Sequence, residues 1–470
     1  MTAGIPHNRI IAGARERGHM NSVYSAGVFT RRAAHLSVFL VCFCPLLSEF
    51  SGPFVVRLAP FVSGTSQAAC FAASPTNAAP NNWSQWRGPA RDSHLPDASA
   101  WPDSLHGMKE TWKIELGPGY SGPIVWNDFV FVTETVDKKR EVVRALNRKT
   151  GEEVWRAGWD GAMTVPFFAR SNGDWIRSTP ACDGQSIYVG GMRDVLVCLD
   201  IQDGTRKWHV DFTQENGSEL PAFGFVSSPL VVGKHVYVQA GGGFAKLDKR
   251  TGQVLWTTLA DGGGMSGSAF SSPVLATLAG KQQVVVQTRQ LLCGVDPVNG
   301  DVLWKQEVPS FRGMNILTPT VFRDGVFTST HKSNSFFYRV EKDADQFRVA
   351  EVWKNAAKGY MSSPVLIDNY VYQHLGNGRF CCIDLRTGNE TWRTESFGKY
   401  WSMVANGTRV LALDERGEIL LINCQPDEFR LLDRQSVSDR ECWAHLAVSG
   451  RDVFVRDLAS VRMLRWSDAP

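Results

Sequence analysis

Short runs of apolar and β-branched residues alternate with turn signals along most of the chain, and residues 227–256 show the pattern most clearly. The first run follows Ser-Ser-Pro at 227–229 and turns at Gly233, and three glycines at 241–243 separate the second run from the third. A turn at 248–252 leads into a fourth run that ends on Trp256. Four strands of this length predict one antiparallel sheet that is too small to bury its two faces alone.

The turn before the fourth run recurs along the chain. It starts with Asp or Asn, which can cap the turn through the following backbone amides, and it ends with Gly, which can take a positive φ and close the hairpin with a bulge. A Trp follows four positions later, and its ring can lie on the next sheet while its N–H finds an acceptor. The five copies pair Gly151 with Trp155, Gly204 with Trp208, Gly252 with Trp256, Gly300 with Trp304 and Gly388 with Trp392.

A Ser-x-Pro or Thr-Pro signal opens most copies, and a repeating four-strand unit of roughly 40–50 residues is typical of a propeller blade. The copy around Trp353 lacks the glycine turn, the copy starting at Trp401 lacks a terminal Trp, and the last, at 443–466, has three strands. We expect residues 110–115, with Trp112, to supply the missing strand and close the ring. The predicted fold is an all-β, eight-bladed propeller of four-stranded antiparallel blades, with seven blades as the alternative.

Residues 1–80 differ from the rest. Arg31 and Arg32 precede an apolar run at 36–47, which is too short for a spanning helix and typical of an export signal. We therefore predict an export signal and linker over 1–80, a propeller domain over 81–470, and a periplasmic or cell-envelope location with membrane contact only through an N-terminal anchor. A leader that stays uncleaved and disordered is the alternative. The 50 Lys and Arg against 47 Asp and Glu form no basic stripe, which argues against nucleic-acid binding.

The repeat Ser-x-Pro … Leu-Asp-x-x-Thr-Gly-x-x-x-Trp resembles that of the pyrroloquinoline-quinone-like propellers, over about 83–466. That family includes quinoprotein alcohol dehydrogenases and BamB, a lipoprotein scaffold of outer-membrane β-barrel assembly. The opening Trp-x-Gln-Trp-Arg-Gly-Pro from Trp83 is similar to that of many exported members. We interpret it as a lid segment whose two Trp side chains, Trp83 and Trp86, pack on the blades. The resemblance implies the architecture and leaves the activity open.

Cys381 and Cys382 are adjacent, and some of the resembling dehydrogenases place a vicinal disulfide against the quinone. The alternative, which we favour, is a structural site for a small side chain under the docked Trp. Equivalent positions hold Ala145, Cys198 and Gly294, whereas Lys246 breaks the rule. The cysteine and histidine spacings predict no metal site.

Inter-blade connections meet on one face of a propeller, just before each inner strand. We expect aromatic and polar groups there to form a ring that holds a ligand, or alternatively to pack between blades. The long connection 156–177, which includes Phe167 and Phe168, points to the same face. The predicted ring comprises Tyr120, Arg177, Phe225, Phe270, Asn315, Tyr360, Trp401 and Trp443.

A quinone site would need a Ca²⁺ bed, an Asp base and an Arg at the mouth. Arg177 and Asn315 stand in suitable places, but no Asp accompanies the blade starts. We therefore predict an exported, monomeric, non-catalytic scaffold without a cofactor, which binds a protein or a small-molecule or glycan ligand at the mouth. One alternative is a dehydrogenase that uses pyrroloquinoline quinone (PQQ) and Ca²⁺ to oxidise an alcohol or sugar. The other is a carbohydrate- or peptide-recognition module.

Overall fold

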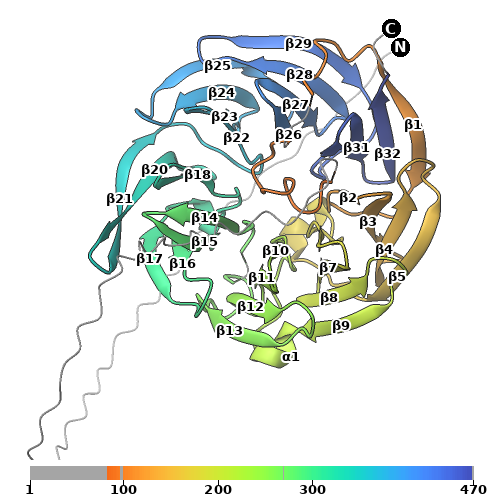
Figure 1. Ribbon diagram of the computed structural model, residues 1–470, viewed down its shortest axis with the longest axis horizontal. Helices are drawn as coiled ribbons and strands as arrows, with labels where there is room; N and C mark the ends of the chain where they lie inside the picture. The colour runs from red at the N-terminus through yellow and green to blue at the C-terminus, as the bar shows by residue number, and fades with distance from the viewer. Residues whose placement is uncertain (1–81, 96–98, 268, 468–470) are drawn as a thin grey trace, which may run out of the picture. The chain divides into compact units, whose positions relative to one another are not determined.

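The computed structural model describes residues 82–95, 99–267 and 269–467, and these form a ring of eight four-stranded antiparallel sheets (Figure 1). The predicted eight-bladed propeller is therefore confirmed over the seven-bladed alternative. The export signal and linker predicted for 1–80 lie outside the described residues. No helix within the described ranges combines the length and the apolar character that crossing a membrane requires.

The first four blades follow the chain from the innermost strand outward. Blade one comprises β2 (Ile124–Trp126), β3 (Phe129–Val136), β4 (Arg140–Asn147) and β5 (Glu153–Asp160); blade two comprises β6 (Ala181–Cys182), β7 (Ser186–Gly191), β8 (Val195–Asp200) and β9 (Arg206–Asp211). Blade three comprises β10 (Leu230–Val232), β11 (His235–Gln239), β12 (Phe244–Asp248) and β13 (Val254–Thr258); blade four comprises β14 (Val274–Leu278), β15 (Lys281–Gln287), β16 (Leu291–Val295) and β17 (Val302–Glu307).

The next three blades repeat this order. Blade five comprises β18 (Thr320–Phe322), β19 (Gly325–Ser329), β20 (Ser335–Asp343) and β21 (Gln346–Asn355); blade six comprises β22 (Val365–Ile367), β23 (Tyr370–His374), β24 (Arg379–Asp384) and β25 (Glu390–Ser396). Blade seven comprises β26 (Trp401–Asn406), β27 (Arg409–Asp414), β28 (Glu418–Cys424) and β29 (Phe429–Ser436). Three short helices, η1 (Phe167–Asn172), α1 (Phe212–Asn216) and η2 (Phe311–Gly313), lie in inter-blade connections.

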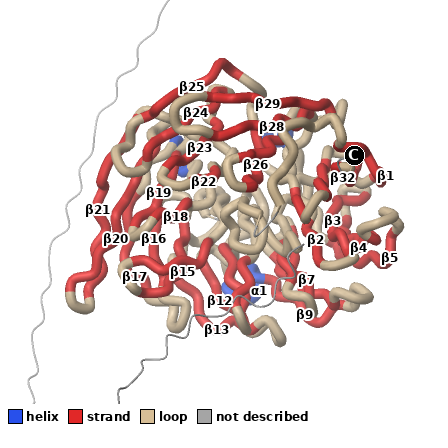
Figure 2. The backbone as a smooth tube through the Cα atoms, turned by 45° about the horizontal axis from the view of Figure 1, so that its top comes forward, coloured by secondary structure: helices blue, strands red, loops and turns tan. Residues whose placement is uncertain are grey.

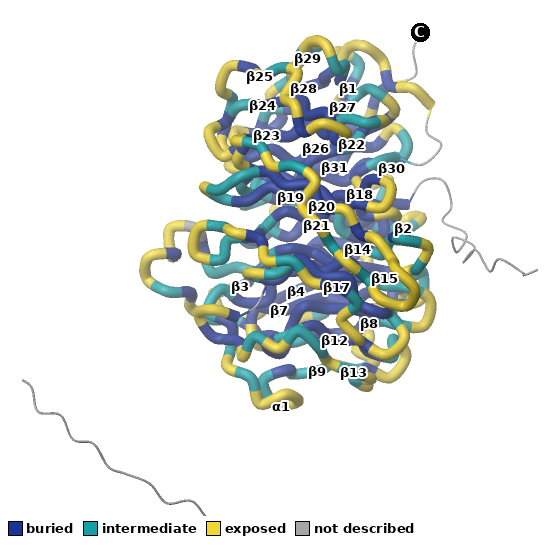
Figure 3. Tube along the Cα trace, turned by 90° about the vertical axis from the view of Figure 1, so that its left-hand side faces the viewer, coloured by how far each residue is buried: buried dark blue, intermediate teal, exposed yellow. Residues whose placement is uncertain are grey.

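Blade eight joins the two ends of the described chain, as predicted. It contains β30 (Ala447–Ser449), β31 (Asp452–Arg456) and β32 (Ser460–Trp466), and its outermost strand is β1 (Met108–Glu115), paired antiparallel with β32. The buried residues of the sheets pack against the neighbouring blades, while the outer turns are exposed (Figure 3). Closure by β1 thus gives blade eight the same four strands as the others.

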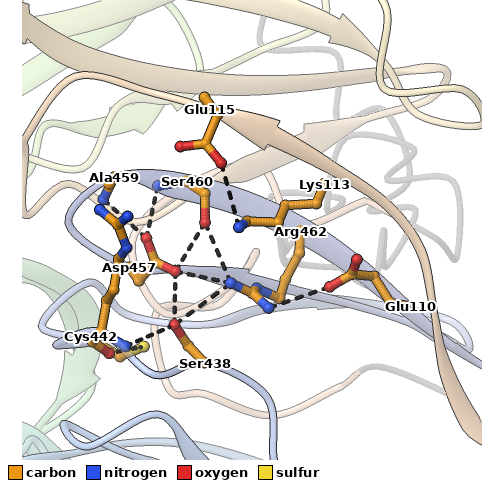
Figure 4. Close-up of polar contacts among 10 residues, drawn as sticks. Glu110, Lys113, Glu115, Ser438, Cys442, Asp457, Ala459, Ser460 and Arg462 are labelled. Atoms are coloured by element: carbon orange, nitrogen blue, oxygen red, sulfur yellow. Dashed lines mark hydrogen bonds and ion pairs between the residues drawn. The ribbon is translucent and has the colours of Figure 1, made fainter.

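A polar network around Asp457 holds the closing strand (Figure 4). The Asp457 carboxylate accepts hydrogen bonds from the hydroxyls of Ser438 and Ser460, at 2.7 and 2.8 Å, and from the guanidinium of Arg462 at 2.9 Å. The same guanidinium reaches Glu110 on β1 at 3.2 Å. These contacts lower the pKa of Asp457 against the opposing effect of burial, the largest single influence on it. Arg462 therefore links a buried carboxylate to the N-terminal strand.

The recurrent turns have the predicted geometry. The five turn glycines have φ between 74° and 83°, and each hairpin shifts register just before its turn. In blade three the Asp248 carboxylate accepts from the amides of Arg250 and Thr251 at 3.0 and 2.9 Å. The Asp-x-x-Thr-Gly signal thus reports a capped, bulged hairpin.

The repeated Trp side chains tie each blade to the next. The Trp155 Nε1–H donates to the Ile201 carbonyl at 3.1 Å, and a Cβ added to Gly204 would lie 2.5 Å from the Trp155 ring. Only glycine therefore leaves room for this stacking. The same pair of contacts joins Trp112 to Arg148 and Gly151, Trp208 to Lys249 and Gly252, Trp256 to Val298 and Gly300, and Trp353 to Leu385 and Gly388.

Two of the Trp side chains depart from this scheme. Blade five has no glycine turn, and the Trp304 Nε1–H bonds instead to the side chain of Gln283 in its own blade at 2.6 Å. Trp392 donates to the Gln425 carbonyl of blade seven at 2.9 Å. The Trp304 ring still shares a buried cluster with Val326 and Phe336 of blade five, as predicted, but it has no glycine turn to stack on.

The small residues before each turn lie opposite the Trp of their own blade. Cys382 pairs with Trp392, and both Cys381 and Cys382 are buried free thiols, so the structural interpretation of this pair holds. Lys246, which breaks the small-residue rule, pairs with Trp256 and extends past its ring to donate to the Pro297 carbonyl at 2.6 Å. A long chain fits there because its ammonium group caps the next turn.

Replacing the turn glycine of blade three should separate Trp stacking from backbone strain. Gly252 and Gly233 both have positive φ, at 78° and 57°, but an added Cβ meets Trp208 at 2.7 Å only at Gly252. We expect Gly233→Ala to cost about 1 kcal/mol of unfolding free energy and Gly252→Ala at least about 2 kcal/mol more. Denaturant unfolding measures both, and equal losses would contradict the stacking role.

The Ser-x-Pro signals supply hydroxyls that join neighbouring inner strands. The amide of Thr179 donates to the Ser228 hydroxyl at 3.1 Å, and the amide of Ser228 donates to the Ser272 hydroxyl at 2.9 Å. In blade five the Thr318 hydroxyl accepts instead from the indole N–H of Trp86 at 2.8 Å. The Ser-x-Pro motif therefore links neighbouring blades by hydrogen bonds around the propeller axis.

Residues 82–95, here called the plug, lie at the centre of the ring (Figure 1). The plug does more than the predicted lid, because it bonds to inner strands almost all the way around. Its contacts are Trp83 with Val125 of blade one, Ser84 with Cys182 of blade two, Arg91 with Ser228 and Pro229 of blade three, Trp86 with Thr318 of blade five, Arg87 with Pro364 of blade six, Ser93 and Leu95 with Ala405 of blade seven, and Trp86 with His445 beside blade eight.

Two buried guanidinium groups anchor the plug without a bonded carboxylate. Arg91 donates to Gln85 and to the carbonyls of Ser228 and Pro229, and Arg87 donates to Ser93 and to two carbonyls. Burial lowers the pKa of Arg87 to about 10 and that of Arg91 to about 9, so both stay charged at neutral pH. Backbone carbonyls therefore take the place of counter-ions at the axis.

Candidate functional site

All eight inter-blade connections meet on one face of the propeller, where loops fill the centre of the ring (Figure 2). They line a hollow of about 1790 Å³, here called the mouth pocket. At the other end of the inner strands, Asn82 accepts a hydrogen bond from the amide of Asn127 in the β2–β3 turn at 2.7 Å. The plug therefore enters from the opposite face, and its Trp86 reaches the pocket lining.

Four of the seven residues predicted to contact a ligand line the mouth pocket. These are Tyr120, Arg177, Tyr360 and Trp443, and Phe270 from the same predicted ring lines it too. Phe168, from the long connection singled out in the sequence, is also part of the lining.

The structure places Phe225, Asn315 and Trp401 in the interior, which removes them as direct contacts of a ligand in the pocket. Asn315 donates to the carbonyls of Arg289 and Val308, both at 3.1 Å, and Trp401 donates to Asp414 at 3.0 Å. Residues next to them in the sequence line the pocket instead: Val226 beside Phe225, Met314 and Ile316 on either side of Asn315, and Tyr400 beside Trp401. Because extended backbone alternates its side chains, a shift of one residue exchanges core for pocket.

One side of the mouth pocket is a chain of aromatic rings from the connections between blades one and five. Phe168 contacts Phe223 with ring centroids 6.3 Å apart, and Phe223 contacts Phe270 at 5.6 Å. Farther round, His331 lies 5.9 Å from Phe311 and 4.3 Å from Tyr360. Burial lowers the pKa of His331, so its ring is neutral at pH 7 and behaves as part of the aromatic wall.

The other side is formed around Trp443. Its ring stacks on Tyr400 with centroids 5.7 Å apart, and it meets the edge of Tyr120 at 6.4 Å. Burial raises the pKa of Tyr120 to about 12, so its hydroxyl keeps its proton and can donate to a ligand. The Trp443 N–H is engaged by Glu441 at 3.0 Å.

Arg289 fixes the shape of the pocket, a role for which the sequence contains no motif. Its guanidinium donates to the carbonyls of Gly313 and Arg312, at 2.7 and 2.8 Å, and more weakly to Met265 and Gly267. It therefore clamps the connections before β14 and β18 to each other. Burial lowers the pKa of Arg289, and its charge faces the Phe270 ring at 4.5 Å.

The mouth pocket does not fit a quinone and its calcium ion. Its lining has Glu307, Glu351 and Glu441 as carboxylates but no Asp. Cys381 and Cys382 are buried and lie outside the lining. Over the ranges that the structure describes, no three His, Cys, Asp or Glu side chains gather closely enough to hold a metal ion. The side chains that line the pocket therefore lack the ligands and the base that a quinone-dependent dehydrogenase would need.

Comparisons with known proteins place the fold in a family. The outer membrane protein assembly factor BamB of Yersinia pestis is 20% identical over 335 residues, which is 71% of this chain and 70% of the relative. That of Moranella endobia is 19% identical over 67% of this chain and 70% of its own. The crystal structure of BamB from Moraxella catarrhalis superposes with a TM-score of 0.56 at 14% identity, over 77% of this chain and 99% of the other.

The family model described as outer membrane protein assembly factor BamB matches residues 139–394, more than half of the chain. The resemblance noted in the repeat is thereby confirmed, and this chain belongs to the BamB family of PQQ-like propellers.

Proposed function

We propose that this protein is an exported scaffold of the cell envelope that holds a partner protein in the mouth pocket without transforming it. The relatives are named for assembly of outer membrane proteins, and this supports a partner in the same process. The observation that carries the proposal is the mouth pocket itself, because a hollow of about 1790 Å³ lined from all eight connections is large enough for a protein segment.

The lining favours binding over catalysis. Aromatic side chains and Arg usually dominate binding energy at protein interfaces, and Tyr120, Tyr360, Trp443 and Arg177 are of these types. General acid–base catalysis requires a titratable group within hydrogen-bond reach of a substrate. The His331 ring packs against Tyr360 and Phe311, and the Glu441 carboxylate accepts a hydrogen bond from the Trp443 N–H. These two titratable groups are therefore already in contact with aromatic side chains of the pocket wall.

Replacing Tyr360 and Trp443 together by Ala should weaken partner capture and leave the ring of blades intact. Each side chain should contribute about 1–2 kcal/mol of binding free energy if it is an anchor. The measurement is pull-down from the native envelope fraction, with the thermal unfolding temperature of each variant recorded beside it. Tyr370→Ala is the control, because Tyr370 lies on a blade hairpin outside the pocket lining.

A loss of the same partners from the control variant would point to general damage instead of a site. Equal recovery of every partner by the double variant and the parent would remove the mouth pocket from consideration.

A further inference from the structure

The lining of the mouth pocket has a surplus of positive charge. Its lining includes five cationic side chains, Arg177, Arg289, Arg312, Lys354 and Lys399, against the three carboxylates of Glu307, Glu351 and Glu441. That is a surplus of two positive charges. A surface of this sign attracts an acidic partner and repels a basic one.

Most of these cations form no ion pair with another described residue. Lys354 lies 3.9 Å from Glu351. Across the part of the chain that the structure describes, Arg177, Arg312 and Lys399 form no ion pair. Arg312 and Lys399 are exposed, so their charges are open to a bound molecule.

The cations lie on the faces of the aromatic rings. Arg177 lies 5.9 Å from the centroid of Tyr120, and both Arg312 and Lys332 cover Phe311, at 5.1 and 4.5 Å. Arg289 covers Phe270 in the same way. A sugar ring stacks on a bare aromatic face, so a ring face that is covered by a side-chain cation cannot take part in such stacking. The edges of the rings and the charged ends of the Arg and Lys side chains remain available to a ligand. The lining therefore favours anionic groups next to apolar ones over a glycan.

An apolar rim extends this surface on one side of the mouth. Phe167 is 80% exposed, Phe168 54%, Met265 50% and Phe311 40%, and all four belong to connections between blades one and five. Large exposed apolar groups of this kind mark interaction surfaces. Together with the cations, they match a chain that alternates carboxylates with bulky apolar side chains.

Resting on the proposed function, we propose that the mouth pocket selects extended peptide segments that carry both acidic and aromatic or bulky aliphatic residues. The carboxylates of the segment pair with Arg177, Arg312 and Lys399, and its apolar side chains lie on the Phe167–Phe168 rim. A polyanion such as a nucleic acid fits less well, because Glu307 and Glu441 in the lining repel a dense run of phosphates.

Fluorescence anisotropy with three labelled synthetic peptides of equal length tests this selectivity. The first contains Glu and Phe, the second has Lys in place of Glu, and the third has Ala in place of Phe. We expect the first to bind at least about tenfold more tightly than either of the others, and its affinity to fall as salt is added. Combined Arg312→Gln and Lys399→Gln should weaken it about fivefold or more, whereas Arg434→Gln on the exposed face of β29 should not.

The possible results separate this inference from the proposed function. Equal or tighter binding of the Lys peptide, or stronger competition by a polyphosphate than by the Glu–Phe peptide, would overturn the charge selectivity. If none of the peptides binds but the Tyr360→Ala, Trp443→Ala variant loses its partners, the scaffold function stands and this inference is wrong. If that variant also keeps every partner, both fail.

Discussion

A chain that begins at residue 117 is expected to lose cooperative unfolding, because it lacks both the plug and β1. Without β1, blade eight would have three strands and β32 would become an unpaired edge. The truncation also removes the buried side chains of Trp83, Trp101, Leu105 and Trp112. Loss of a single buried Trp side chain costs about 3–5 kcal/mol, so several together approach the whole stability of a typical domain.

Circular dichroism and differential scanning calorimetry measure this effect. A chain that begins at residue 81 is the control, because it keeps every contact described for the propeller. The contribution of the strand can be separated from that of the plug with Trp112→Ala, which removes the bond to Arg148, the stacking on Gly151 and the ring contact with Phe454. A truncated chain as stable as the control would show that neither segment closes the ring.

The repeated parts of the fold can be predicted from sequence because each is encoded locally. The Asp-x-x-Thr-Gly turn requires a cap and a positive φ within five residues, and the Trp four positions later meets the same turn in the next blade. Blade five shows the boundary of this reasoning. Its hairpin between β20 and β21 has no glycine turn, so Trp304 bonds to Gln283 instead.

The mouth pocket was predictable as a region but not residue by residue. Tyr120, Arg177 and Phe270 each stand one place before a Ser-x-Pro triplet, whereas Phe225 stands two places before its own; the one-place count gives Val226, which lines the pocket. Trp401 is already the first residue of β26 and points inward, and Tyr400 lines the pocket. Blade seven has no Pro after Ser402, so the one-place count has no marked starting point there.

The plug was the least predictable feature. Arg91 bonds to Ser228 and Pro229, which are more than 130 positions away, and Arg87 reaches Pro364. Its sequence is not part of the repeat, so no second copy reveals its role. Arg residues in such a segment suggest a solvated surface, and only the ring of inward-facing carbonyls makes their burial favourable.

Two buried groups should give the unfolding free energy opposite pH dependences that largely cancel in the parent protein. Glu141 on β4 accepts from the amide of Met192 and the indole of Trp159, both at 2.8 Å, and burial raises its pKa from 4.5 to about 7. His445 beside the plug contacts Trp86, and burial lowers its pKa from 6.5 to about 3. Neither has an ion-pair partner among the described residues.

The sign of each effect follows from proton binding in the two states. Between pH 4.5 and 7 the unfolded chain releases the Glu141 proton while the folded protein keeps it, so this group destabilises the fold as pH rises, by about 3 kcal/mol in all. Below pH 6.5 the unfolded chain binds a proton at His445 that the folded protein refuses, so stability is lost as pH falls toward 3. The two slopes oppose each other between about pH 4.5 and 6.5.

Single variants should expose each slope, because every other titrating group is common to parent and variant. The stability of the parent relative to Glu141→Gln should increase by about 3 kcal/mol from pH 7 to pH 4.5. The stability of the parent relative to His445→Gln should decrease over the same change. Urea unfolding across this range measures both differences, and the differences matter more than the absolute cost of either substitution. If the Glu141→Gln difference is constant with pH, the carboxyl is ionised in the folded protein, and its two hydrogen bonds outweigh its burial.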